Sequence, residues 1–132
     1  MHTRSILSQF LQNVLPSIHA ARFNVLIAAI EALACGAQAR VTSLGRGLSG
    51  YAYPKHKIKR MDRLLSNSHL YQERYSIYSA MTKTLVKGLP EPVIAIDWSP
   101  LCADQSWQLL RAALPAGGRS VTLYEEVHPR SS

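Results

Sequence analysis

The stretch VIAIDWS, residues 93–99, marks the point at which the pattern of the chain changes. Four apolar residues followed by Asp97 predict a buried strand over 93–97 that ends in a carboxylate. Just before it, residues 88–92 contain one glycine and two prolines, which favour a break between structural elements. We therefore expect a boundary at 89–92, with helices before it and a sheet after it.

The residues after this boundary have the pattern of a small sheet. Residues 119–127 (RSVTLYEEV) alternate in polarity and are rich in β-forming residues, which predicts a strand. Residues 107–114 (WQLLRAAL) fit either a strand or a helix. Because two glycines, Gly117 and Gly118, lie between the two segments, we expect a β-hairpin.

Before the boundary, apolar residues recur at the spacing of helices. The first expected helix begins at a Ser5 cap and ends near Pro16. The second covers about 20–35, is buried, and stops at Gly36. Three further helices are expected over the segments 42–48 with Thr42 or Ser43 as cap, 54–67 with Pro54 at its first position, and about 70–87.

The fold class expected from this order is α+β, with an all-helical region over 1–88 followed by the start of a sheet over 93–132. A length of 132 residues suits one domain, or one small domain and part of another. The hydrophobic content of 47% is typical of a globular chain.

Cysteines and apolar segments bear on where the protein resides. Cys35 and Cys102 fit no zinc spacing, so two buried, reduced thiols are expected, with a disulfide as the alternative. The most apolar window, 23–39, is interrupted by polar residues and is too short to span a bilayer. The N-terminus has no convincing secretion signal. These features favour a protein of the cytoplasm and no membrane partner.

The positive charge is concentrated in one segment. The net charge is +7, and residues 40–87 contain ten of the fifteen Lys and Arg residues against only Asp62 and Glu73. A local excess of this kind indicates a polyanionic partner such as nucleic acid, or an anionic membrane surface.

The helix expected from Pro54 has an apolar back and a basic front. Ile58, Met61, Leu64 and Leu65 form an apolar stripe. Together with the short helix before it, this segment predicts a helix-turn-helix over about 41–67 that contacts double-stranded DNA. A basic face that is merely solvated is the alternative. The candidate DNA-contacting residues are Arg46, Lys55, His56, Lys57, Lys59, Arg60 and Arg63.

Other motifs are weaker. Residues 45–50 (GRGLSG) match a dinucleotide-binding pattern but do not follow a strand or open a long helix, so we expect these glycines to permit a tight helix–helix turn. Asp97 could hold a divalent cation, but a two-metal site needs several convergent carboxylates. Asp104, Glu125 and Glu126 are the only acids after it, and none is a compelling second ligand.

Taken together, the motifs resemble the N-terminal third of a bacterial insertion-sequence transposase of the DDE type, from the cut-and-paste, hairpin-forming group with an RNase H-like core. The resembling segments, in order, are TSLGRGL (42–48), KHKIKRMDRLLSNSHLYQER (55–74), VIAIDWS (93–99) and GRSVTLYEEVHP (118–129).

The resemblance implies a bacterial protein associated with the nucleoid, and it implies a role for each part of the chain. Asp97 corresponds to the first acid of the catalytic triad, a Mg²⁺ ligand on the first strand of the RNase H-like sheet. Residues 40–74 correspond to the region that recognises the terminal inverted repeats of the transposon, and 106–127 to the second and third strands. The second Asp and the Glu of the triad have no counterpart here.

These observations predict a truncated transposase that binds transposon ends but does not cleave DNA by itself. Its Mg²⁺ site would be incomplete, and its partners would be double-stranded DNA and either a full-length transposase or another copy of the chain. One alternative is a stand-alone helix-turn-helix regulator whose hairpin serves dimerisation. A complete small metal-dependent nuclease is disfavoured by the shortage of carboxylates.

Overall fold

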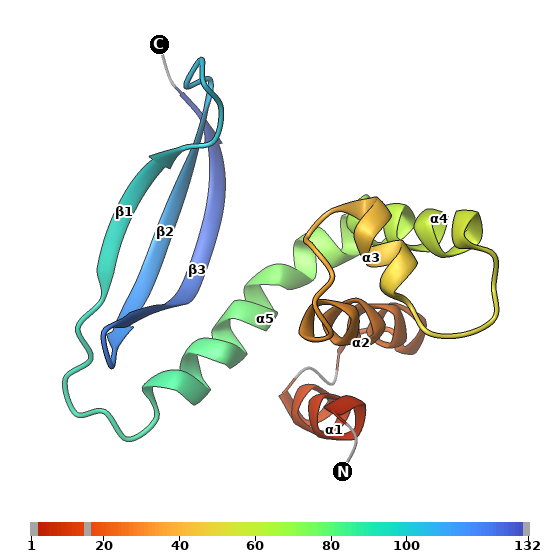
Figure 1. Cartoon of the computed structure of the whole chain (residues 1–132). Coiled ribbons are helices and arrows are strands. Elements are labelled where there is room, and N and C mark those ends of the chain that lie inside the picture. Colours follow the sequence, from red (N-terminus) through yellow and green to blue (C-terminus); the bar gives the residue numbers. More distant parts are fainter. Residues whose placement is uncertain (1–2, 15–16, 131–132) are drawn as a thin grey trace. The chain divides into compact units, whose positions relative to one another are not determined.

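The computed structural model describes residues 3–14 and 17–130 of the chain (Figure 1). Within these residues the fold is α+β, with five helices followed by a three-stranded antiparallel sheet, which confirms the predicted class and order. The elements are α1 (Thr3–Val14), α2 (Ala20–Ala34), α3 (Val41–Gly47), α4 (Pro54–Leu65), α5 (Ser68–Val86), β1 (Ala95–Pro100), β2 (Trp107–Ala116) and β3 (Arg119–Pro129).

Two compact units share these elements, and they divide at 75/76, inside α5. The last turns of α5 belong with the sheet because Thr82 Oγ1 donates a hydrogen bond to the Leu123 carbonyl (3.2 Å). In addition, the rings of Tyr78 and Tyr124 meet edge to face, with centroids 5.2 Å apart. The change of structural type expected at 89–92 therefore lies within the second unit.

Helix capping differs from the expectation in two helices, α1 and α3. Ser5 is the third residue of α1 and so is not its cap, and Pro16 lies outside the described residues. Thr42 and Ser43 lie inside α3, whose N-cap is Arg40. The Ser43 hydroxyl instead accepts a hydrogen bond from the Gln38 amide (2.9 Å), so it fixes the turn before the helix. Local hydrogen bonding of this kind competes with helix capping.

The first unit has its core between α2, α3 and α4. The buried side chains of this cluster are Ala28, Ala29, Leu44, Leu48, Met61 and Leu64. The apolar stripe predicted on α4 therefore faces the core at Met61 and Leu64, whereas Leu65 is 57% exposed and is not part of it. As expected, Pro54 begins α4 and α2 ends just before Gly36, whose φ is +97°.

The sheet of the second unit has the order β1-β2-β3. Residues 107–116 form a strand and not a helix, and Gly117 and Gly118 have positive φ values of 57° and 74°. Such values suit the two-residue turn of a hairpin, which confirms the predicted connection. A register shift between Ala112 and Ala113 marks a β-bulge in the β2–β3 pair.

The strand expected to be buried is exposed. β1 begins at Ala95, includes Asp97 as its third residue and lies at the edge of the sheet, so Asp97 does not end the strand. Ile96 and Trp98 are 70% and 54% exposed. A run of apolar residues therefore identified a strand but not its environment, because burial requires a covering layer that a local pattern cannot specify.

Both cysteines are reduced and exposed, so the expectation of buried thiols was wrong. Cys35 forms the C-terminal cap of α2, and Cys102 lies in the β1–β2 connection. Among the described residues, no helix has the length and apolar character needed to cross a bilayer.

The β1–β2 connection supplies a pH-dependent contact. Asp104 Oδ1 accepts hydrogen bonds from the backbone N–H (3.1 Å) and the hydroxyl (2.8 Å) of Ser106. The bond from the Ser106 backbone, followed by the one from its hydroxyl, lowers the pKa of Asp104 below its ordinary value of 3.8. Because the folded-state pKa is the lower one, the stabilisation is complete above the unfolded pKa and is lost as pH falls through the folded value.

We therefore expect Asp104→Asn to reduce the acid sensitivity of the sheet unit. Thermal unfolding of the two proteins, compared at pH 6 and at steps below pH 4, should show a smaller loss of stability on acidification for the variant. Asn retains the accepting oxygen but does not titrate. A parallel acid response in both proteins would contradict the assignment.

Candidate nucleic-acid interface

The outer side of α4 carries a row of cations. Lys55, Lys59 and Arg63 follow one another at four-residue spacing, which places them on one side of the helix. All three are exposed, whereas Met61 and Leu64 on the opposite side are buried in the core. The buried stripe thus fixes the direction in which this row, the α4 row, faces.

His56 and Arg60 lie beside the α4 row and are also exposed. The His56 ring lies near that of Tyr53, the N-cap of α4, with centroids 6.4 Å apart. Arg46 is exposed in the last turn of the preceding helix, α3. The structure therefore brings six of the seven predicted contact residues to the exposed surface of α3 and α4.

Lys57 has a different position. Its Nζ donates a hydrogen bond to the carbonyl of Leu48 (2.7 Å), the residue that ends α3. The side chain is partly buried. Its charge therefore satisfies a backbone acceptor at the end of a helix and holds the connection between α3 and α4.

None of the cations of this surface forms an ion pair with an acid in the described residues. Within residues 3–14 and 17–130, the ion pairs involve Arg4, Arg22, Arg111 and His128, with further contacts at Arg74. None of the seven predicted contact residues is among them. Asp62 is the single acid on α4 and is exposed. Unpaired exposed cations are available to neutralise an incoming anion.

Sequence reasoning missed two tyrosines in the connection between α3 and α4. Tyr51 is fully exposed, and Tyr53 is 73% exposed. Exposed aromatic rings next to cations are common where proteins contact bases or sugars. Their position in the segment SGYAYP, between a helix and a basic helix, was the available signal.

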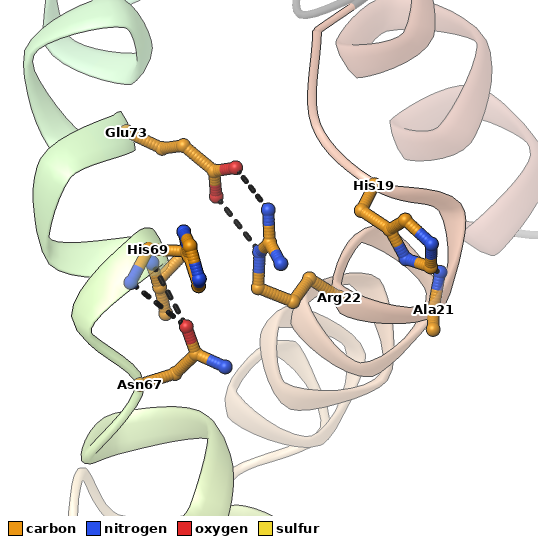
Figure 2. A network of polar contacts seen from close by, with 7 residues as sticks. His19, Ala21, Arg22, Asn67, His69 and Glu73 are labelled. Atoms are coloured by element: carbon orange, nitrogen blue, oxygen red, sulfur yellow. Dashed lines mark hydrogen bonds and ion pairs between the residues drawn. The ribbon is translucent and has the colours of Figure 1, made fainter.

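Sequence reasoning also missed an ion pair between α2 and α5. Arg22 Nε donates to Glu73 Oε2 (3.1 Å) and Arg22 Nη2 donates to Glu73 Oε1 (Figure 2). These hydrogen bonds raise the pKa of the Arg22 guanidinium above its ordinary value. Because 51 residues separate the partners, no local pattern could have indicated the pair.

Asp97, the predicted metal ligand, has surroundings that do not suit Mg²⁺. It is exposed, and its carboxylate accepts a hydrogen bond from Ser99 Oγ (3.1 Å). Its neighbour across the sheet is a cation, Arg111, whose Nε donates to Glu125 Oε1 (2.6 Å). Mg²⁺ requires oxygen ligands that converge on one point.

The other acids of the sheet unit do not complete a metal site. Glu126 Oε2 accepts from the Tyr124 hydroxyl (2.7 Å), and Asp104 is bound to Ser106 in a connection. Adjacent strand residues such as Glu125 and Glu126 face opposite sides of a sheet. In the part of the chain that the structure describes, no three His, Cys, Asp or Glu side chains come together in a group able to hold a metal.

The exposed cations of α4 are therefore the predicted site residues that the fold gathers along one helix, with Arg46 exposed on the neighbouring α3. Their placement depends on the core packing of α4 and on the short connection to α3. No family model, curated protein or solved structure matches this chain.

Proposed function

We propose that the chain binds double-stranded DNA through the exposed basic surface of α3 and α4, as the end-binding part of a DDE transposase. The observation that carries the proposal is the α4 row, three exposed cations with no acidic partner that face away from a packed core. Such a row can neutralise successive phosphates and release their counterions.

The dimensions of α4 suit this role. Twelve residues give a helix about 18 Å long, which can enter a major groove about 12 Å wide. The preceding α3 packs against it, and six residues connect the two helices. A short helix followed by a basic one supports the proposal, because in a helix-turn-helix the second helix contacts DNA.

The assignment to a transposase rests on the sequence resemblance over 42–74, 93–99 and 118–129. The resemblance implies three strands in this part of the chain, and the antiparallel sheet of order β1-β2-β3 is consistent with it. We assign no DNA cleavage to the described residues, because Asp97 has no second carboxylate directed at the same point.

Fluorescence anisotropy with a labelled 30-bp duplex, between 50 and 200 mM salt, tests DNA binding directly. We expect the logarithm of the affinity to fall linearly with the logarithm of the salt concentration.

Selection from a randomised duplex library then tests end recognition. The expected result is enrichment of a sequence from the ends of an insertion element. Binding that does not depend on salt would contradict the proposal, and a selected palindrome with two half-sites would favour the regulator instead.

A further inference from the structure

A second feature of the helical unit is a pocket of about 220 Å³ between α2 and α4. Ala21, Val25 and Leu64 form its apolar part. Its polar part comes from three arginines and an asparagine, namely Arg22, Arg60, Arg63 and Asn67. All of these residues belong to the same compact unit.

Arg22 has a fixed orientation in this pocket. Its Nε and Nη2 are held by the two carboxylate oxygens of Glu73, as Figure 2 shows. Glu73 therefore has both oxygens occupied, and Arg22 has its second terminal nitrogen, Nη1, left to donate. A guanidinium held in this way has little orientational freedom to lose when it binds an anion.

Asn67 is fixed in a similar manner. Its Oδ1 accepts hydrogen bonds from the backbone N–H groups of His69 (2.9 Å) and Leu70 (3.2 Å), so it caps α5 (Figure 2). The acceptor end of the amide is thus occupied and its donor end, Nδ2, is left. Arg60 and Arg63 lie three residues apart on α4. With Arg22 and Asn67, they give the pocket hydrogen-bond donors, and no carboxylate is among the described side chains that line it.

We propose that this pocket binds one phosphate group, with the carbon atoms next to the phosphate lying against Val25 and Leu64. Glu73 offsets the charge of Arg22, so Arg60 and Arg63 supply the two positive charges that match a phosphate monoester of charge −1.5 to −2 at neutral pH, about two units. Paired guanidinium groups are the usual protein ligands of phosphate oxygens.

The volume limits the ligand. Pockets for whole drug-sized ligands measure about 300–1,000 Å³, so this smaller pocket suits a phosphate with its adjoining sugar. The phosphate can be the monoester of a free nucleotide, whose charge the two arginines match, or a backbone phosphate of DNA bound along α4, which carries a single negative charge. In the second case the inference rests on the proposed function, because Arg63 is shared between the pocket and the α4 row.

Titration of the full chain with inorganic phosphate and with thymidine monophosphate, followed by the NMR signals of Arg22 Nε–H and the Asn67 side-chain amide, tests the pocket. We expect saturable shifts of both signals. Arg60→Gln should weaken binding of thymidine monophosphate about tenfold, the effect of losing one hydrogen bond to a charged group. Lys55→Gln, the matched control, removes the same charge from the same helix outside the pocket and should change it less than about twofold.

Two further results distinguish the source of the phosphate. Displacement of thymidine monophosphate by a duplex would assign the site to the DNA backbone, and simultaneous binding of both would assign it to a free phosphate ester. If the wild-type chain bound no duplex, the proposed function would fail. If the variant Lys55→Gln/Lys59→Gln then bound thymidine monophosphate as tightly as wild type, the pocket would stand without that function. If Arg60→Gln and Lys55→Gln weakened the binding of inorganic phosphate and of thymidine monophosphate equally, the proposed pocket would be wrong, whatever the affinity for duplex. Circular dichroism of each variant verifies the fold.

Discussion

Replacing Gly45 by alanine is expected to destabilise the helical unit by about 1–3 kcal/mol, the usual cost of forcing an extra methyl group into a packed contact. A Cβ at this position would lie 2.5 Å from the Cα of Ile58 and 2.7 Å from its backbone nitrogen. These are backbone atoms of α4, so no rotation of a side chain can relieve the contact. The two helices would have to separate.

The separation of α3 and α4 should extend to neighbouring contacts. Leu44 and Leu48 beside Gly45 belong to the core cluster, as does Met61 one turn beyond Ile58. In addition, the hydrogen bond from Lys57 to the Leu48 carbonyl requires the present spacing of the helices. Thermal and urea unfolding, followed by circular dichroism, measure the loss.

Gly47→Ala is the matched control because it makes the same change in the same helix. The nearest atoms to its Cβ would be the methyl groups of Ala32 (3.1 Å) and Ala37 (3.3 Å), which requires a displacement of only a few tenths of an ångström. Helix propensity alone predicts that either change stabilises by up to about 1 kcal/mol. A Gly45→Ala protein as stable as wild type would show that the approach of α3 to α4 is looser than the structure indicates.

Features encoded by neighbouring residues could be predicted from the sequence. Pro54 at the start of α4, Gly36 after α2 and the Gly117–Gly118 turn each depend on the backbone preferences of one or two residues, and all three are confirmed. The same is true of the basic surface, because helical spacing already separates Lys55 and Lys59 from the buried Met61.

Features that depend on distant residues could not be predicted. Lys57 was grouped with the other cations because it is equally basic, but its direction depends on a carbonyl nine residues away. The pocket arginine, Arg22, needs Glu73 from another helix. In the sheet, the apolar run before Asp97 predicted burial, yet whether a strand is covered depends on what packs against it.

Removing the α4 row should have the largest effect on DNA binding. For the triple variant Lys55→Gln/Lys59→Gln/Arg63→Gln, we expect a loss of affinity for a 30-bp duplex of about 10²–10³-fold at 0.1 M salt. The slope of log affinity against log salt should become less steep by about 2.7, since each phosphate contact contributes about 0.9. The fold should persist, because all three side chains are exposed and none forms an ion pair in the described residues.

The control is the variant Lys83→Gln/Lys87→Gln/Arg119→Gln, which removes the same net charge from exposed positions in the second unit. If DNA is attracted only by the overall charge of +7, the two triple variants should lose affinity equally. If DNA lies along α4, the control should lose much less and keep its salt slope, because no phosphate contact is removed. The slope is the more decisive of the two measurements, since it counts contacts at phosphates, whereas a fall in affinity alone also follows from a weaker long-range field.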